Sequence, residues 1–353
     1  MKAILFRLLA ATAFLASAAA ASAEPLVINF AYAGTGVGGR PFLAQTATAV
    51  AYNEGYLTDE FKNDPDISIN FTPVSSSSLV NEAFASGQIQ FGSQGDLGAI
   101  IGRASGLETK IIYLQHIRGP IQIAVPTGST VAKVEDLAGK KIAVQFSGNA
   151  RLILEKLLKD RGVDASKVNL VNLDAAGAQL ALASGDVDAA AGLNELLTLE
   201  QKGLAKVIYT SRNDKPVYGR QSQVSVDAKF EAAHPEIVQR VVKALVKAEA
   251  WAATETNREA LFNVWAKSGH TVESFRIDFE GQALKDRFNP VIDAFIISRY
   301  AEQKDDSLRL GLIRNDFSLD GWFEPKYVET AIKDLNLQGF WPARDLDGNP
   351  VAN

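Results

Sequence analysis

The strongest constraint on the fold is a short stretch of sequence that occurs twice. Residues 83–90 read AFASGQIQ and residues 181–188 read ALASGDVD, which places Gly87 and Gly185 98 positions apart. In each copy an apolar helical pattern ends at a glycine, the residue that most readily closes a helix in the left-handed conformation, and an alternating strand pattern follows. Convergence on common α/β sequence patterns would also produce so short a match, but we expect two α/β lobes of similar build.

The sequence around the first copy alternates between strand and helix patterns. Residues 26–33 (LVINFAYA) predict a buried strand, and after a glycine-rich turn a proline is placed to open a helix over residues 41–55. Residues 66–73 predict a second strand, and the serines at 75–78 cap a helix that Gly87 ends. This alternation predicts, in each lobe, a mainly parallel sheet with helices on both faces.

Two segments, near residues 118–120 and 218–220, are expected to carry the chain between the lobes, because each joins extended apolar runs. The first lobe then consists of residues 24–118 together with 221–353, and the second lobe of residues 119–220. Apolar residues of the late part recur at helical spacing and should pack on the first lobe; they are Ile237, Val241, Leu245 and Ala248.

The first 23 residues have the pattern of a secretory signal peptide. A positive start at Lys2 and Arg7 precedes an apolar core at residues 4–15. The small residues at 21–23 form a cleavage site, so we expect cleavage after Ala23. The apolar core is shorter than the roughly 20 residues that a membrane span requires, and no later segment is long and apolar enough. We therefore expect an exported, soluble protein of the periplasm.

The composition narrows the functional classes. The chain has no cysteine, so neither a disulfide nor a lipid-anchoring thiol is possible. Removal of the signal peptide takes away two of the 36 Lys and Arg residues and none of the 41 Asp and Glu residues, which leaves a formal charge of −7. Nucleic-acid binding is disfavoured because neutralising phosphates needs a basic surface, although an acidic protein can still carry a locally positive cleft.

A glycine-rich turn after the first strand has the form G-x-G-x-x-G. It matches the fingerprint of dinucleotide-binding folds, but the second predicted strand ends in Pro73 and Val74, without the acidic residue that holds the ribose. Free backbone N–H groups in the turn, with the arginine that follows, suit a sulfonate or carboxylate, whereas a tight turn with a solvated arginine is the simpler alternative. The candidate ligand-binding residues here are Thr35, Gly36, Val37, Gly38, Gly39 and Arg40.

Further candidates follow predicted strands, where open α/β sheets bind ligands. Ser147 and Asn149 can donate to an anion or only cap a helix. Asp96 or Glu195 can receive an amino group or only complement a helix N-terminus. His116, just before the first crossover, can touch the ligand, tune closure or be purely structural. The complete set is Gln94, Gly95, Asp96, Gln115, His116, Ser147, Gly148, Asn149, Arg151, Asn194 and Glu195.

Catalysis and bound cofactors find no support in the sequence. The histidines His116, His234 and His270 are far apart, and neither an H-E-x-x-H motif nor a nucleophile elbow occurs. We therefore expect a binding protein without metal or cofactor, and not an enzyme.

Several stretches, in a fixed order, point to one family. They are residues 81–87 (NEAFASG), 134–144 (VEDLAGKKIAV), 181–189 (ALASGDVDA) and 322–325 (WFEP). In them the chain resembles the aliphatic sulfonate, taurine and nitrate family of solute-binding proteins of ABC importers. The resemblance implies a type II periplasmic binding protein fold, in which two Rossmann-like lobes joined by a hinge hold an oxyanion through backbone amides and hydroxyl or arginine groups. It also implies a monomer that delivers its solute to permease subunits in the inner membrane.

The chain departs from that family in two ways. Related pyrimidine-precursor binders carry a cysteine-rich signature, which a chain without cysteine lacks, and residues 282–320 are longer and more charged than the family leads us to expect. Our hypothesis is a periplasmic protein that captures an alkanesulfonate or taurine-like anion for an importer. The alternatives are a zwitterionic or neutral nitrogenous solute in the same role, or a secreted small-molecule sensor or enzyme on the same fold.

Overall fold

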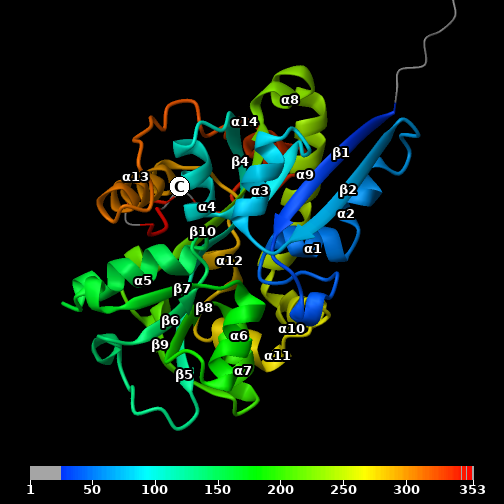
Figure 1. The fold of residues 1–353 in the computed structure, drawn as a ribbon. Helices are drawn as coiled ribbons and strands as arrows, with labels where there is room; N and C mark the ends of the chain where they lie inside the picture. Colours follow the sequence, from blue (N-terminus) through cyan, green and yellow to red (C-terminus); the bar gives the residue numbers. More distant parts are fainter. Residues whose placement is uncertain (1–24, 343, 347, 352–353) are drawn as a thin grey trace, which may run out of the picture.

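The structure, a computed structural model, describes residues 25–351 except 343 and 347, so the predicted signal peptide and its cleavage site lie outside the described residues. Two lobes form around two separate five-stranded sheets (Figure 1). The first sheet contains β1 (Leu26–Ala33), β2 (Ile67–Val74), β3 (Phe91–Gly95), β4 (Thr109–Gly119) and β10 (Arg220–Asp227). The second contains β5 (Gln122–Pro126), β6 (Lys141–Val144), β7 (Asn169–Asn172), β8 (Ala189–Gly192) and β9 (Ala205–Thr210).

Helices flank both sheets. Before the first crossover the chain forms α1 (Ala47–Asn53), α2 (Tyr56–Phe61), α3 (Ser77–Ala85) and α4 (Asp96–Ala104). The second lobe contributes α5 (Asn149–Asp160), α6 (Ala175–Ser184) and α7 (Asn194–Gln201). After β10 come α8 (Ala228–Ala233), α9 (Pro235–Ala253), α10 (Arg258–Ala266), α11 (Val272–Asp278), α12 (Leu284–Arg287), α13 (Ala294–Arg309) and α14 (Lys326–Asp334).

The two sheets have the same build, as the repeated sequence indicates. Their strand orders are β2-β1-β3-β10-β4 and β7-β6-β8-β5-β9, so the strands that follow the two repeated glycines, β3 and β8, both occupy the middle. Both glycines are left-handed, with φ of 69° at Gly87 and 79° at Gly185. The equivalence reaches single side chains. Gln90 accepts a hydrogen bond from the N–H of Asn29 at 2.8 Å, and Asp188 accepts one from Lys141 at 2.8 Å. The prediction of two similar α/β lobes is confirmed.

The expectation of mainly parallel sheets holds for four strands of each sheet and fails for the fifth. β1 is parallel to β2 and β3, and β6 is parallel to β7 and β8, but β10 and β5 each run antiparallel to both of their neighbours. The reason is that each of these strands arrives in its sheet from the other lobe, without the α-helical crossover that joins successive parallel strands within one sheet. The chain thus changes sheets between β4 and β5 and between β9 and β10. The lobe limits that we predict at residues 118 and 220 remain a proposal.

The first helix begins later than predicted. Instead of a helix over residues 41–55, residues 40–46 are irregular, and α1 starts at Ala47. Thr46 caps it, because its hydroxyl accepts a hydrogen bond from the N–H of Ala49, whereas a proline at the helix start supplies no such acceptor. The preceding residue, Gln45, has a φ of 70°, which redirects the chain before the helix begins.

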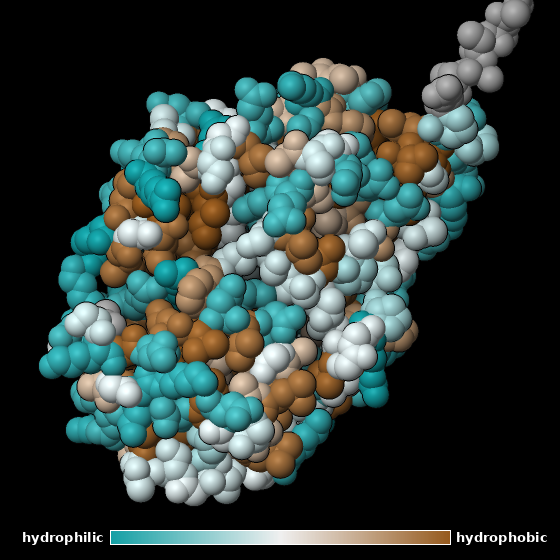
Figure 2. All heavy atoms as spheres, in the orientation of Figure 1, coloured by the Kyte–Doolittle hydropathy of each residue, from teal (hydrophilic) through white to brown (hydrophobic). Residues whose placement is uncertain are grey.

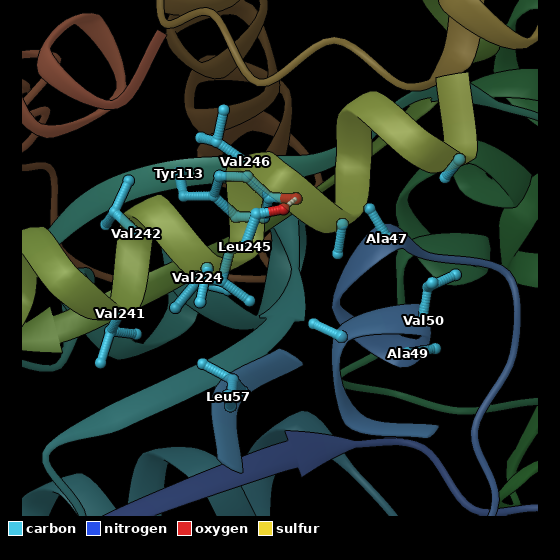
Figure 3. Packing of buried hydrophobic residues seen from close by; sticks show 14 of the residues in the cluster. Ala47, Ala49, Val50, Leu57, Tyr113, Val224, Val241, Val242, Leu245 and Val246 are labelled. Atoms are coloured by element: carbon cyan, nitrogen blue, oxygen red, sulfur yellow. Dashed lines mark hydrogen bonds between the residues drawn. The ribbon is translucent and has the colours of Figure 1, made fainter. Parts of the chain in front are cut away.

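The apolar stripe predicted on the late helix does pack on the first lobe. α9 packs against α1 and β4, and Val241, Val242 and Leu245 share one buried core with Val224 of β10 and Ala47 of α1 (Figure 3). These side chains are buried in one hydrophobic core with Tyr113. Burying a side chain of this size contributes about 1.5–3 kcal/mol, so the long C-terminal region stabilises the first lobe.

Residues 282–320, which are more charged than we expected of the family, form α12 and α13. The apolar side of α13, with Phe295 and Ile296, packs on the core beneath Trp322 of the first lobe. Its acidic side reaches α5 of the second lobe, where Lys156 Nζ lies 2.6 Å from Asp306 Oδ2 and 3.2 Å from Glu302 Oε1. The segment therefore connects the two lobes.

Candidate functional site

A cavity of about 410 Å³ lies between the lobes, at the strand ends of both sheets. It brings together many of the residues selected from sequence. Those in its wall are Thr35, Gly36, Val37, Gly38, Gln94, Gly95, Gln115, Gly148, Asn149 and Glu195. The other selected residues are outside the wall: Gly39, Arg40, Asp96, His116, Ser147, Arg151 and Asn194.

The glycine-rich turn offers fewer free amides than predicted. Residues Val37–Gly39 form a 3-10 turn, and the helix that was expected to follow directly is displaced. The N–H of Gly36 donates to the carbonyl of Arg40, that of Val37 to Ser268, and that of Gly39 back to Gly36. A Cβ at Gly36 would lie 2.8 Å from the carbonyl oxygens of Phe42 and Ser268, so glycine allows a close approach of the backbone. The turn shapes the wall rather than forming a helix-start anion site.

The N-termini of the second-lobe helices differ in whether an acidic side chain compensates their partial positive charge. α5, α6 and α7 all begin at the cavity wall, with Gly148, Asp174 and Glu195 in it. The carboxylate of Asp174 accepts a hydrogen bond from the N–H of Gly177, and that of Glu195 accepts one from Leu193, each at 2.8 Å. These acids already complement α6 and α7. α5 begins at Gly148 with no side-chain cap, so among these three helices only α5 presents its positive N-terminus to a ligand.

Arg220 supplies the cationic side chain of the wall. It is only 3% exposed, and its guanidinium donates to the carbonyl of Pro120 at 3.4 Å, to Ser222 Oγ at 3.4 Å and to Gln45 Oε1 at 3.3 Å. All three acceptors are neutral and distant. Burial lowers the pKa of Arg220, and carboxylates such as Asp278 act in the opposite sense through space, so the side chain stays charged. A buried charge with long hydrogen bonds to neutral partners favours an anion beside it.

The two arginines selected from sequence are placed elsewhere. Arg40 is exposed. Arg151 lies along α5 with its guanidinium 4.2 Å above the ring of Phe146 and its Nε 2.8 Å from Glu155 Oε1. The structure therefore places both arginines outside the cavity wall, where Arg220 is the arginine present.

Two other selected residues, Asp96 and Asn194, are buried and hold separate elements together through hydrogen bonds. Asp96 is buried and accepts hydrogen bonds from the N–H of Gln221 at 2.6 Å and from Gln303 Nε2 at 2.7 Å. Burial raises the pKa of Asp96 to about 6, and the N–H of Gln221 opposes the shift. Asn194 donates to the carbonyl of Ser274 at 2.9 Å. Asp96 therefore holds α4, β10 and α13 of the first lobe together, whereas Asn194 joins the second lobe to the first.

His116 belongs to a buried polar cluster at the hinge. Arg287 Nε donates to His116 Nε2 at 2.9 Å, and Arg287 Nη2 lies 2.8 Å from Asp278 Oδ2. Asp278 Oδ1 in turn accepts from Gln122 Nε2 of β5 at 3.3 Å. Burial lowers the pKa of His116 well below its usual value, with Arg220 and Arg287 acting in the same direction. A neutral imidazole that accepts from Arg287 fits a structural role.

Sequence reasoning missed several wall residues. The sequence prediction placed Arg220 only in a crossover, although an arginine at the start of a predicted strand is a signal that could have identified it. Ser268 and His270 come from the distant helical region, and no motif marks them. Burial lowers the pKa of His270 to about 4, so it is neutral and contacts Thr198 Oγ1 at 3.1 Å.

Two α/β lobes of matching strand order, with a ligand-sized cavity between them, define the architecture of periplasmic binding proteins. The chain belongs to the NMT1/THI5-like family, whose model matches residues 45–259. The taurine-binding periplasmic protein of Escherichia coli (strain K12) is 28% identical over 225 residues, which cover 59% of this chain and 68% of that protein.

Solved structures agree with this assignment of the fold. The periplasmic sulfonate-binding protein SsuA of a putative sulfonate ABC transporter from Methylobacillus flagellatus KT is 27% identical with a TM-score of 0.74, over 94% of this chain and 99% of that chain. The desulfurization enzyme DSZB shares the fold alone, at 19% identity and a TM-score of 0.62 over 87% of this chain and 99% of its own. Throughout the described part of the chain, each helix is too short or too polar to cross a membrane.

Proposed function

We propose that this protein is the periplasmic solute-binding component of an ABC importer and that it holds a small sulfonate anion between its lobes. The observation that carries the proposal is Arg220, a buried arginine in the cavity wall whose hydrogen-bond acceptors are all neutral. The uncapped start of α5 adds a second positive contribution in the same wall. The names of the relatives, taurine-binding and sulfonate-binding periplasmic proteins, support the same solute class.

The proposal includes export and delivery. The sequence pattern of residues 1–23 supports removal of a signal peptide after Ala23, and the periplasmic relatives support the compartment. Permease subunits in the inner membrane are the expected partners, and the protein is expected to act as a monomer. Each lobe would contribute part of the surface that the permease contacts, so only the closed form presents the complete surface.

Binding without chemistry is part of the proposal. The named relatives bind their solutes, whereas the desulfurization enzyme shows that the same fold also carries catalysis. Incubating the protein with candidate sulfonates and analysing the mixture by mass spectrometry distinguishes a binding protein from an enzyme. We expect unchanged sulfonate, and formation of sulfite would favour an enzyme.

A ligand with a hydrogen-bond donor, such as taurine, is supported by Gln94. The Nδ2 of Asn81 donates to the carbonyl of Gly98, so Asn81 Oδ1 accepts from Gln94 Nε2 at 3.1 Å. Gln94 is in the wall, but its Oε1 is buried without a partner, 2.8 Å from where a Cβ on Gly98 would lie. Rotation of the Gln94 side chain would bring this oxygen to an amino group on the solute. Comparing taurine with propanesulfonate, which has a methyl in place of the amino group, measures this contribution.

Arg220→Gln is the direct test of the anion site. Loss of a charge-assisted hydrogen bond costs about 1.5–3 kcal/mol, which predicts a loss of affinity of about 10- to 100-fold for ethanesulfonate in isothermal titration calorimetry. Arg151→Gln is the matched control, since Arg151 pairs with Glu155 outside the wall, and it should bind as the wild type does. Unchanged affinity in Arg220→Gln, or no sulfonate raising the melting temperature of the wild type, would contradict the proposal.

A further inference from the structure

Part of the cavity wall is made by α6. Five residues of this helix are in the wall, one polar (Gln179) and four small or apolar: Ala175, Ala176, Ala178 and Leu180. The first lobe also contributes apolar side chains to the cavity, Val37 and Leu43 among them. The polar groups discussed above, Arg220 and the start of α5, come from other elements. The cavity therefore has a charged part and an apolar part.

Leu180 is unusual for a leucine on the surface. It is 73% exposed, more than any other large apolar side chain in the described residues, and yet it lines the cavity. α6 reads AAGAQLALAS, so it has no polar outer face of the kind that surface helices normally present. On the face that carries α6, apolar surface appears among polar side chains (Figure 2). Exposed apolar surface at the edge of a cavity is typical of a binding site.

The size of the cavity also argues for more than a two-carbon solute. Its volume of about 410 Å³ falls in the range of roughly 300–1,000 Å³ that is typical of pockets for larger organic ligands. A molecule with the dimensions of ethanesulfonate would occupy the positive end and leave the α6 wall in contact with water. An apolar body attached to the sulfonate would cover Ala176 and Leu180 and remove that surface from water.

We infer that the α6 wall is a subsite for the apolar body of the ligand, so that this protein prefers sulfonates with an alkyl chain of about six carbons or with an aromatic ring over taurine or ethanesulfonate. The inference rests on the proposed sulfonate binding. Leu180 is the specificity-determining side chain, because it lies at the open end of the wall, where a longer body passes it.

The test is a series of linear alkanesulfonates from two to eight carbons, titrated calorimetrically into the wild type and two variants. In the wild type, affinity should rise about fourfold per added methylene until the wall is filled. Leu180→Ser should leave the affinity for ethanesulfonate unchanged and reduce the gain per methylene for the longer members, with about a tenfold loss for octanesulfonate. Leu204→Ser is the matched control, since Leu204 is a 46% exposed leucine of the same lobe outside the cavity wall.

The outcomes separate this inference from the proposed function. If no sulfonate of any length binds, the proposed function fails. If sulfonates bind with an affinity independent of chain length, or if Leu180→Ser weakens all members equally, the apolar subsite is overturned while sulfonate binding stands. Because Leu180 is exposed, the variant should keep the melting temperature of the wild type, which differential scanning fluorimetry checks.

Discussion

At the scale of single residues, Glu249 of α9 has an unfavourable environment for a charge. Its side chain is fully buried, and its carboxyl oxygens make no hydrogen bond of good geometry, with the Tyr113 hydroxyl as the nearby polar group. The hydroxyl of Tyr113, in the same core, donates to the carbonyl of Leu245 at 3.3 Å (Figure 3). Burial raises the pKa of Glu249 well above its usual value, so the folded protein holds this group as a neutral acid.

Glu249→Gln should therefore stabilise the protein at alkaline pH. Because the pKa in the folded state is raised, the folded state binds a proton that the unfolded chain releases, and the free energy of unfolding falls as the pH rises above about 4.3. The glutamine has no charge to bury, so the variant should gain about 1–3 kcal/mol at pH 8 and little at pH 4. Urea unfolding at several pH values measures this.

The exposed Glu236 on the same helix provides the control for that experiment. Its side chain is 65% exposed, so Glu236→Gln should change the free energy of unfolding by less than about 0.5 kcal/mol at either pH. Equal stability of Glu249→Gln and the wild type across the pH range would mean that the carboxyl group is solvated in solution.

Residue placement shows where sequence reasoning reaches its limit. Gln94 and Gly95 end β3 and Gly148 follows β6, so they lie in the cavity wall, because the carboxyl ends of parallel strands meet at one edge of a sheet. Arg40 and Arg151 also follow strands, but side-chain direction and a neighbouring Glu155 decide their partners, and no local pattern encodes either. The cation that does line the wall, Arg220, arrives from a strand that crosses from the other lobe.

At the scale of elements, a tight contact between the lobes joins the start of α5 to the end of β3. The side chain of Asn149 donates to the carbonyl of Gln221 at 2.9 Å and rests on Gly95. A Cβ at Gly95 would lie 1.8 Å from Asn149 Oδ1. Gly95 has a φ of −80°, which any residue adopts, so the need for glycine comes from the other lobe and not from its own backbone.

Gly95→Ala should thus impair closure without unfolding either lobe. We expect at least a tenfold loss of sulfonate affinity by calorimetry, with a melting temperature of the unliganded protein close to that of the wild type. Adding Asn149→Ala removes the three atoms that the new methyl would meet, so the double variant should recover affinity relative to Gly95→Ala alone. A double variant as weak as the single one would show that the contact does not limit closure.

Elements were predicted best where local chemistry alone determines them. The glycines that end α3 and α6 and the serine cap of α3 act within a few residues, and the structure has all three. α1 began later because Thr46, and not the proline-led segment before it, supplies the cap. The antiparallel strands β5 and β10 depend on which lobe the chain comes from, which is information that no short window of sequence contains.

At the scale of the whole molecule, the structure has its lobes in contact across the cavity. Gln145 Nε2 donates to the carbonyl of Ser75 at 2.9 Å, and Asn194 and Ser274 exchange hydrogen bonds. Closing without a solute leaves Arg220 buried among neutral acceptors, which is unfavourable. An anion removes that cost, so it binds the closed form more tightly. Moving a population from 1:99 to 99:1 needs about 5.5 kcal/mol of such preference.

Small-angle scattering should detect this shift of the population from the open to the closed form. We expect the radius of gyration of the unliganded protein to exceed that calculated from this structure, and to decrease on saturation with a bound sulfonate. The Arg220→Gln variant has no charge to bury, so it should close more readily without ligand. The difference in radius of gyration between its unliganded and liganded forms should therefore be smaller than in the wild type. Identical curves for wild type with and without a sulfonate that binds in calorimetry would rule out closure as the response.

α5 contacts the first lobe at both ends. Asn149 meets β3 at the cavity, and Lys156, about 10 Å further along the helix axis, lies between the acids of α13. The second contact is beside Gly219, next to the crossover. We expect the lobes to turn about the crossovers, and a displacement near such a pivot is magnified at the rim, so the lengths of the side chains on α13 should set how wide the mouth can open.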